Sequence, residues 1–359
     1  MLSSADDLPD RCMDATGALL NGSQPIVSGD TVHAEGSWEE GLRQGPWQLL
    51  YADGTRSAEG SFEQGREHGS WSFWTEQGAR HRKGTYLHGE LHGSWTTWRE
   101  DETVWSVGSY SLGTPHGDWT YYGADGTVVV SRGRFVNGAR YGTWEFFHAD
   151  GTRKQSGGYS AGLKNGTWRA WHENGSPASE GDFLSGLEVG EWSTFDEQGH
   201  ITRTVTYAHG KKHGVETLWH EGLDVPRLRG ENVDGEKNGP WTLWFADGTV
   251  AMESHFEHGK RAGHWIGYHA NGQKKFEGDV LDGQDHGTWT YWYDDGTMQM
   301  TGERMGGKEV GAWTTWHPSG AIKSEGSYSV GLQDGEWRYY DELGTLVRTE
   351  TWEGGQPRP

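Results

Sequence analysis

The segment Gly69-Ser70-Trp71-Ser72-Phe73-Trp74 leads into Thr75-Glu76-Gln77-Gly78, and a second segment then runs through Gly84-Thr85-Tyr86 to Gly89. A glycine two residues before a fixed position recurs thirteen times, at steps of 24 or 25 residues. That position holds tryptophan twelve times and Glu216 once; the tryptophans are Trp47, Trp71, Trp95, Trp119, Trp144, Trp168, Trp192, Trp241, Trp265, Trp289, Trp313 and Trp337. An internal repeat of this length predicts a repeat architecture.

Each repeat contains two short segments rich in aromatic residues, Thr and Ser, which are typical of β-strands. Between the two segments stands Asp-Gly or Asn-Gly, the strongest short-range signal for a β-hairpin. The dipeptide occurs at Asp53-Gly54, Asp125-Gly126, Asp150-Gly151, Asn174-Gly175, Asp247-Gly248, Asn271-Gly272 and Asp295-Gly296. The sequence therefore predicts one hairpin per repeat.

The register of the hairpin follows if Asp53-Gly54 forms a two-residue turn. Counting outward from this turn pairs Trp47 with Gly60 and Gly45 with Phe62. Residues at these positions share one face of the sheet, because side chains alternate along a strand. Each large ring then lies across from a glycine, where it covers bare backbone. We expect the ladder tryptophans to form this structural face.

The predicted fold is all-β. We expect an elongated repeat solenoid, a single antiparallel meander of about thirteen hairpins with a 24-residue period, over residues 31–355. Residues 1–30 fit the repeat poorly and are expected to cap the first edge or to be mobile. The repeat near residues 214–235, which contains Glu216, is irregular and is either a hinge or partner contact or simple drift. Residues 356–359 form a tail.

A second aromatic stripe lies three residues after the ladder position, on the opposite face of the sheet. We interpret it as a candidate binding surface, the alternative being that it only packs the sheet. Its residues are Trp74, Trp98, Tyr122, Phe147, Trp171, Phe195, Trp219, Trp244, Tyr268, Trp292, Trp316 and Tyr340.

The chain is acidic, with 52 Asp and Glu residues against 31 Lys and Arg residues and a formal charge of −21. Such a surface repels nucleic acid and anionic lipid, both of which require basic patches. It favours a basic protein partner or serves solubility alone. Cys12 is the single cysteine, and no segment is apolar enough to span a membrane. The N-terminal residues do not resemble a signal peptide, so we expect a cytoplasmic protein.

The repeat resembles the MORN repeat, a hairpin unit of roughly 23 residues, and is closest to the bacterial variant grouped with antitoxin-like proteins. The residues that carry the resemblance are of the type Gly142-Thr143-Trp144-Glu145-Phe146-Phe147, Asp150-Gly151, Gly158-Tyr159 and Gly162. The resemblance covers about residues 31–355. It implies a scaffold that binds proteins or lipids, and for the antitoxin-like variant a protein that neutralises a toxin by binding it.

A second resemblance is to the choline-binding and glucan-binding cell-wall repeats, which hold cations or sugars on stacked aromatic residues. It rests on the segment Gly287-Thr288-Trp289-Thr290-Tyr291-Trp292 and the residues that follow it. Those repeats are nearer twenty residues long and lack the Gly-x-x-x-Gly link seen from Gly65 to Gly69. Glycan or choline binding is therefore the alternative function.

The 18 histidines do not predict a metal site. Histidines at equivalent positions of successive repeats, such as His68 and His92, would lie about 10 Å apart, whereas ligands of one zinc ion lie within about 4 Å of one another. We expect them to be solvated loop residues, with no cofactor bound. A single-layer sheet offers little enclosure for catalysis, so we expect no enzyme activity.

The sequence thus predicts a non-enzymatic scaffold that binds another protein, an antitoxin-like protein directed against a basic toxin being one form of it. Nucleic acid is excluded as a partner and a membrane is disfavoured by the negative charge.

Overall fold

The computed structural model of this protein describes residues 11–29 and 31–358. The chain divides into two compact units, residues 1–175 and residues 176–359. The described residues form strands, turns and bends but no helix. They therefore contain no helix that is long and apolar enough to cross a membrane.

The described part of the first unit contains fourteen strands. They are β1 (Gly22–Ser23), β2 (Ile26–Ser28), β3 (Thr31–Glu39), β4 (Leu42–Leu50), β5 (Arg56–Glu63), β6 (Arg66–Trp74), β7 (Arg80–Leu87), β8 (Glu90–Trp98), β9 (Val104–Ser111), β10 (Thr114–Tyr122), β11 (Val129–Val136), β12 (Ala139–Phe147), β13 (Arg153–Ser160) and β14 (Leu163–Trp171).

The described part of the second unit contains sixteen strands. They are β15 (Pro177–Leu184), β16 (Leu187–Phe195), β17 (Ile201–Ala208), β18 (Lys211–Trp219), β19 (Pro226–Val233), β20 (Glu236–Trp244), β21 (Val250–Glu257), β22 (Lys260–Tyr268), β23 (Lys274–Leu281), β24 (Gln284–Trp292), β25 (Met298–Met305), β26 (Lys308–Trp316), β27 (Ile322–Ser329), β28 (Leu332–Tyr340), β29 (Leu346–Glu353) and β30 (Gln356–Arg358).

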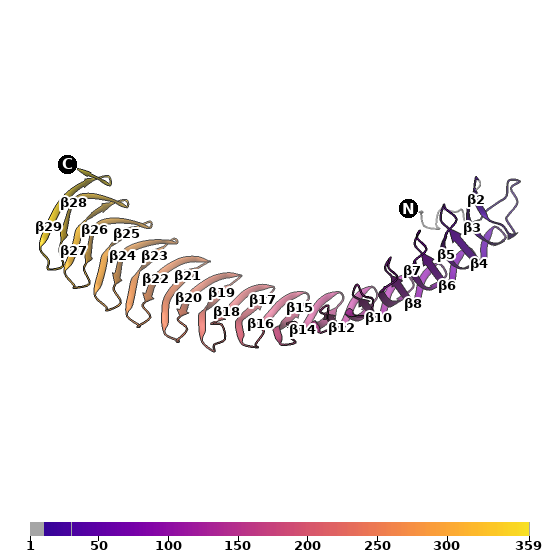
Figure 1. Ribbon diagram of the computed structural model, residues 1–359, viewed down its shortest axis with the longest axis horizontal. Coiled ribbons are helices and arrows are strands. Elements are labelled where there is room, and N and C mark those ends of the chain that lie inside the picture. Colours follow the sequence, from indigo (N-terminus) through magenta and orange to yellow (C-terminus); the bar gives the residue numbers. More distant parts are fainter. Residues whose placement is uncertain (1–10, 30, 359) are drawn as a thin grey trace. The chain divides into compact units, whose positions relative to one another are not determined.

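Within each unit, from β3 onward, every strand pairs antiparallel with the next strand in the chain (Figure 1). The predicted all-β meander of repeated hairpins is therefore confirmed in both units. The short strands β1 and β2 pair with β3 at the start of the first unit, and β30 pairs with β29 at the end of the second. Residues 1–10, which belong to the predicted N-terminal cap, lie outside the described residues, as does residue 359 of the predicted tail.

Two kinds of connection alternate along the chain. A tight turn of two residues joins β5 to β6, and both of its residues have positive φ, 50° at Gln64 and 81° at Gly65. This is the type I′ geometry that matches the twist of antiparallel strands. The backbone N–H of Gly65 donates to the carbonyl of Arg43 in the preceding repeat at 2.9 Å. The tight turn therefore also ties consecutive repeats together.

The second kind of connection is a long loop, and here the predicted two-residue turn at Asp53-Gly54 is wrong. The loop between β4 and β5 spans residues 51–55, in which the Tyr51 carbonyl accepts from Gly54 N–H and Tyr51 N–H donates to Thr55. A register shift beyond Leu49 compensates for the longer loop, so Trp47 still pairs with Gly60 and Gly45 with Phe62. The predicted register is confirmed.

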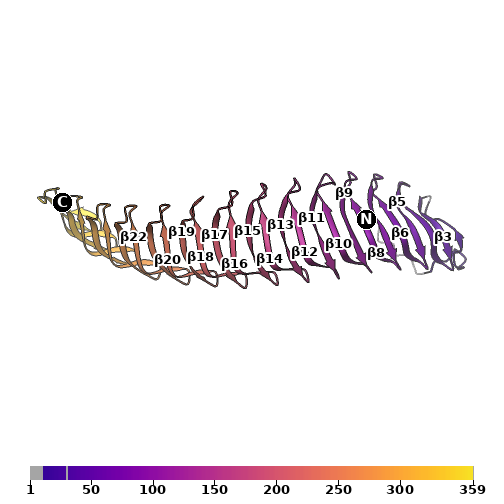
Figure 2. The same cartoon turned by 90° about the horizontal axis from the view of Figure 1, so that it is seen from below.

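The long loops have five residues except at 123–128 and 220–225, where they have six. These two loops account for the steps of 25 residues in the repeat. Figure 2 shows the connections as two rows at opposite ends of the strands within each unit. We call the row of long loops the loop edge and the row of tight turns the turn edge.

The ladder indoles lie on glycines, but these glycines belong to the preceding strand and not, as expected, to the following strand. The Trp71 indole covers Gly60, which precedes it across the tight turn, and not Gly84 across the long loop. A Cβ atom built on Gly60 would lie 2.1 Å from Cδ2 of Trp71, far inside van der Waals contact. Trp71 Nε1 also donates to the carbonyl of Ser61 at 3.1 Å. Glycine is required here because the ring occupies the space of its side chain.

The glycine two residues before the ladder position has a different reason to be conserved within the repeat. Gly69 has a φ of 70°, and a Cβ atom built on it would meet no atom within 4 Å. Positive φ in the middle of strand β6 accompanies a shift of the register between Glu59 and Ser61. Glycine at this position thus permits a positive φ that residues with a side chain rarely adopt, together with the shift in register. It does not serve to make room for a ring.

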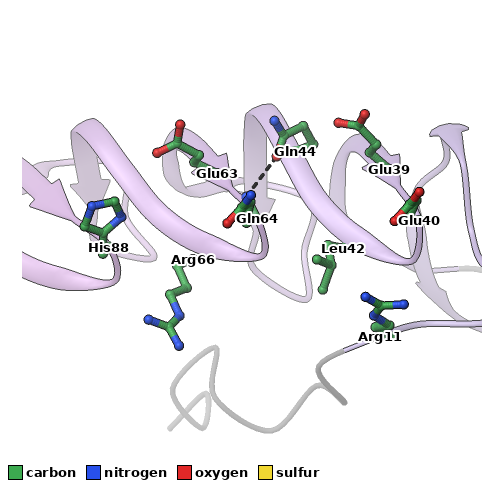
Figure 3. A pocket seen from close by; sticks show the side chains of 9 residues that line it. All are labelled: Arg11, Glu39, Glu40, Leu42, Gln44, Glu63, Gln64, Arg66 and His88. Atoms are coloured by element: carbon green, nitrogen blue, oxygen red, sulfur yellow. Dashed lines mark hydrogen bonds between the residues drawn. The ribbon is translucent and has the colours of Figure 1, made fainter.

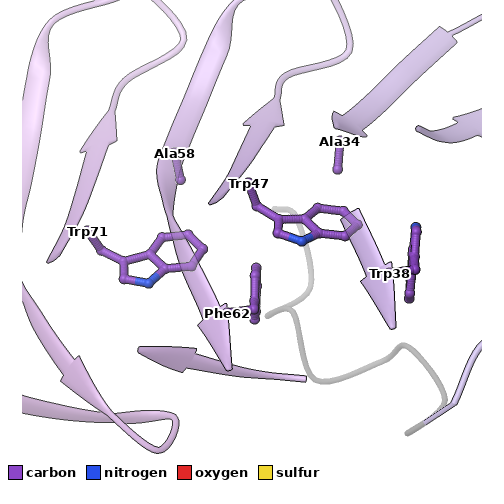
Figure 4. Close-up of a cluster of buried hydrophobic side chains, with 6 residues drawn as sticks. All are labelled: Ala34, Trp38, Trp47, Ala58, Phe62 and Trp71. Carbon is purple, nitrogen blue, oxygen red and sulfur yellow. The ribbon is translucent and has the colours of Figure 1, made fainter. Parts of the chain in front are cut away.

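The ladder is a continuous row of edge-to-face aromatic contacts in the first unit. Eleven of the twelve ladder tryptophans of the chain are buried, Trp192 being half-buried. From Trp38 to Trp168 each indole alternates with Phe or Tyr, except where Trp38 meets Trp47, and ring centroids are 5.0–6.2 Å apart. Figure 4 shows the start of this row, with Phe62 standing between Trp47 and Trp71. Such contacts stabilise beyond the area they bury.

A position of the second unit that lacks the covered glycine but keeps the tryptophan shows the effect. Ser254 stands where the repeat has glycine, and the indole of Trp265 donates to Ala262 instead of to the residue ten positions earlier. Ser254 is itself buried and donates to the carbonyl of Trp241 at 3.0 Å. Without a bare backbone to cover, the indole takes a different place.

The irregular repeat contains a polar centre in place of the indole. Glu216 is buried and receives hydrogen bonds from Lys212, Arg203 and Asn232, each at 2.9 Å. Burial raises the pKa of Glu216, but the hydrogen bonds of Lys212 and Asn232 and the charges of Arg203 and Lys212 outweigh it, so the pKa lies below its ordinary value. Across from Glu216 stands Val205, where the repeat has glycine. The replacement of tryptophan by Glu216 is thus accommodated by Arg203 and Val205 on β17 and by Asn232 on β19.

We predict that Gly60→Ala destabilises the first unit by about 1–3 kcal/mol, because the added methyl group forces the Trp71 indole out of place. The measurement is the free energy of unfolding from urea titrations followed by tryptophan fluorescence. Ser61→Ala is the matched control, since its side chain points to the opposite face. Equal effects of the two changes would contradict the role assigned to Gly60.

We also predict that Glu216→Trp destabilises the second unit, because the indole meets Val205 and leaves Arg203 and Lys212 without their carboxylate. Adding Val205→Gly recovers part of the loss by freeing backbone for the ring. A double-mutant cycle on urea unfolding should give a favourable coupling of about 0.5–3 kcal/mol. A coupling of zero would show that the glycine is not what the indole requires.

Candidate functional site

Acidic residues gather at the loop edge of both units. The long loops of the first unit carry Asp53, Glu76, Glu100, Asp101, Glu102, Asp125, Asp150 and Glu173, against Arg99 as their only Lys or Arg residue. The long loops of the second unit carry Asp196, Glu197, Glu221, Asp224, Asp247, Asp294, Asp295, Asp341 and Glu342, and no Lys or Arg. Most of the charge of −21 is therefore placed on one edge.

The aspartates of these loops are fixed by the loop itself. Oδ1 of Asp53 accepts from the backbone N–H of Thr55 at 2.9 Å and from its hydroxyl at 2.6 Å. The hydroxyl bond and the backbone bond stabilise the ionised form, so the pKa of Asp53 lies below its ordinary value. The pKa is lowered in the same way at Asp101, Asp150 and Asp247. These four aspartates therefore keep their negative charge across the physiological range.

In several repeats the first residue of the long loop holds that loop against the next repeat. Nε2 of His148 lies 3.1 Å from the carbonyl oxygen of Trp171, and His220, His269 and His317 make the equivalent contact at 2.9 Å. The hydroxyl groups of Tyr51 and Tyr293 donate to the equivalent carbonyl oxygens, those of Trp74 and Trp316. The expectation that these histidines are merely solvated is thus wrong, because their rings are half-buried and partnered. Consecutive loops are held at a spacing of about 10 Å, two strand separations.

The second aromatic stripe lies beside the loop edge, at or near the last residue of the nine-residue strands. All of its residues are half-buried, and the structure places one in every repeat except the first, where Leu50 stands at this position, rather than gathering them into one cluster. Trp74, Trp98 and Trp171 end strands β6, β8 and β14. The stripe follows the row of acidic loops along each unit.

Several rings of the stripe already carry a cation from the preceding strand. Arg56 lies over Trp74 at 5.0 Å from the ring centroid, and Arg80 lies over Trp98 at 5.3 Å. Phe147, Trp171 and Trp292 are covered in the same way by Arg132, Arg153 and Lys274. At these five rings cation–π attraction is thus satisfied within the chain. A choline-like ligand would have to displace these side chains.

Sequence reasoning missed a further aromatic line, two residues after the ladder position. Phe73 stacks on Trp71 at 5.8 Å and reaches Trp95 at 6.2 Å, and Tyr121 stacks on Trp119 in the same way. The spacing of two residues was the available signal, since it places these rings on the ladder face. They widen the core and leave the opposite face to the second stripe.

The turn edge of the first unit contains a pocket of about 820 Å³ with a polar lining (Figure 3). Its walls include Glu39, Glu40, Glu63 and His88, together with Arg66. Glu63 and His88 also belong, with His68, to a group of three side chains whose ligand atoms lie within 4.8 Å of one another. This group is able to hold a metal ion.

Comparison with known families identifies the repeat. The MORN repeat variant family matches residues 164–184, 309–329 and 333–353. The prediction that the chain carries MORN-type repeats is therefore confirmed at these segments, and the remaining repeats share their ladder spacing and hairpin register.

No curated protein matches the chain. Among solved structures, the chain is similar to one described as "Crystal Structure of TcdB2-TccC3-Cdc42", with 11% identity and a TM-score of 0.16. The match covers 95% of this chain and 20% of that chain, so this chain spans about a fifth of its length.

We predict that Thr55→Val raises the pKa of Asp53 toward its ordinary value, because the hydroxyl that stabilises the carboxylate is lost. The side-chain carboxyl signal in carbon-13 NMR, titrated between acid and neutral pH, measures this shift. Because the pKa of Asp53 is lowered in the folded chain, the loop interaction stabilises above the ordinary pKa and is lost as pH falls through the lowered value. Thr249→Val in the second unit is the control and should leave Asp53 unchanged.

Proposed function

We propose that this chain, a protein of MORN-type repeats, is a non-catalytic scaffold that binds a basic protein along the loop edge. The observation that carries the proposal is that the long loops contain many Asp and Glu residues but almost no Lys or Arg, Arg99 being the only Lys or Arg residue in the long loops of the first unit. A row of fixed negative charges attracts a positively charged surface and speeds its association.

The geometry of the edge suits a protein partner better than a flexible small ligand. Asp53 and its equivalents are held by their own loops, and residues such as Tyr51 and His148 anchor those loops to the following repeat. These side chains therefore lose little conformational entropy on binding, which favours affinity. The neighbouring stripe adds half-buried Trp and Tyr rings, two of the Trp rings with Arg side chains over them, and these residue types are enriched at protein interfaces.

The alternative function, glycan or choline binding on the stripe, has less support. The faces of Trp74, Trp98, Trp171 and Trp292 are within cation–π distance of Arg or Lys side chains of the chain itself. Anionic lipid is disfavoured by the same acidic loops that favour a basic protein. Within the favoured function, an antitoxin-like protein that neutralises a basic toxin is the specific form we propose.

The test compares two triple variants that remove the same charge. Glu76→Gln, Glu100→Gln and Glu173→Gln neutralise the loop edge, and Glu39→Gln, Glu40→Gln and Glu90→Gln neutralise the turn edge. Cytochrome c serves as a basic probe in calorimetric titrations at low and high salt. We expect binding by the native chain that weakens with salt, a several-fold loss in the loop-edge variant, and little change in the turn-edge variant.

A second arm addresses the antitoxin-like form. Co-expression with a basic toxin encoded next to this chain should restore growth, and the loop-edge variant should restore it less. Equal losses in both triple variants would mean that only net charge matters, and absence of any basic protein bound at low salt would overturn the proposal.

A further inference from the structure

Three side chains with metal-ligand atoms converge at the turn edge of the first unit. Glu63 ends strand β5, His68 lies in strand β6, and His88 is the first residue of the tight turn between β7 and β8. Their ligand atoms all lie within 4.8 Å of one another, and the two imidazole centroids are 5.7 Å apart. Two imidazoles and one carboxylate are a ligand set that zinc accepts.

The fold itself brings these residues together. In a nine-residue strand with a positive-φ glycine, the residue before that glycine lies next to the first residue of the following tight turn. Gln44, which precedes Gly45, shows this: its Oε1 accepts from the backbone N–H of Gln64 at 2.9 Å. His68 and His88 occupy this pair of positions one repeat further along. The pair is separated by 20 residues, so comparing histidines only at steps of 24 residues does not reveal it.

Other repeats lack one or more of the three ligands. The equivalent pair in the next repeat is His92 and Leu112, and the one after that is His116 and Asn137. In the second unit His213 faces Asp234 with 3.8 Å between Nδ1 and the carboxylate, so two ligand types meet there. Within the described residues, three ligand atoms converge only at Glu63, His68 and His88.

The site also contains an unsatisfied atom. Nδ1 of His68 is buried and has no hydrogen-bond partner, although Oε2 of Glu63 lies 3.1 Å away. Buried polar atoms are normally partnered, and an unpartnered one calls for an explanation. A cation between Nδ1 and the carboxylate would satisfy both groups.

We propose that Glu63, His68 and His88 bind one divalent transition-metal cation of the zinc class. Tetrahedral zinc with bonds of about 2.0–2.1 Å requires ligand atoms roughly 3.4 Å apart, so the three side chains have to close slightly. The side chains of His68 and Glu63 are 38% and 51% exposed, which leaves them free to do so. Figure 3 shows Arg66 extending away from Glu63 and His88. Water would complete the coordination.

The consequence of binding is a link between consecutive repeats. Glu63 and His68 belong to the hairpin of β5 and β6, whereas His88 belongs to the hairpin of β7 and β8. A cation that binds the folded arrangement stabilises it, by an amount that grows with the logarithm of the cation concentration above the dissociation constant. The inference does not depend on the proposed partner, because these side chains lie at the turn edge and the partner is assigned to the loop edge.

The experiment uses the full chain without a histidine tag, freed of metal by chelation and dialysis. Titration with ZnCl₂ by calorimetry should show one site, and CoCl₂ should give the visible absorption bands of a low-coordinate cobalt centre. His68→Gln and His88→Gln should each weaken binding on the order of tenfold or more, since each removes one of three protein ligands. Glu63→Gln should weaken it as well.

The matched control is His213→Gln in the second unit, which removes a histidine at the position equivalent to His68 and should leave binding unchanged. Circular dichroism of each variant without metal verifies that the sheet is intact. Zinc binding that is equally strong in the native chain and in His68→Gln with His88→Gln would overturn the proposal, as would absence of binding to the native chain. In either case the contact between Glu63 and His68 is an ion pair only.

Discussion

The structure depends on one contact, an indole laid on the bare backbone of a glycine. At Gly60 the ring of Trp71 occupies the volume in which any side chain would begin, and the indole N–H is satisfied by the adjacent carbonyl of Ser61. This places a large apolar surface against a sheet that has little other core, because only 32% of the residues are apolar. Repetition of the contact in most repeats lets a glycine-rich, acidic chain bury a row of aromatic rings, which is continuous in the first unit.

The two departures from this contact show how strictly it is required. Where Ser254 replaces the glycine, the tryptophan remains but its indole turns to Ala262. Where Val205 replaces it, the tryptophan is absent, and Glu216 binds Arg203, Lys212 and Asn232 instead. Each polar replacement is accompanied by partners on the adjacent strands, as a buried carboxylate requires. The repeat therefore varies in coupled positions rather than in single ones.

The sequence was sufficient for the fold and the register, because Trp47 and Gly60 mark opposing positions whatever the connection between them. It misassigned that connection, since Asp53-Gly54 is compatible both with a two-residue turn and with a five-residue loop, and the compensating shift beyond Leu49 leaves no trace in the composition. The acidic loops were visible only as net charge until the strands placed them on one edge. The cluster of Glu63, His68 and His88 was hidden because the contact joins non-equivalent positions of neighbouring repeats.

The six-residue loops at 123–128 and 220–225 have an evolutionary consequence. In a β-strand, inserting one residue normally rotates every later side chain to the other face. Here the additional residue remains within the loop, and Trp144 and Trp241 still lie on Gly133 and Gly230. One-residue insertions are thus absorbed within the loop edge, so the length of these loops can vary while the hydrophobic register of the sheet stays the same.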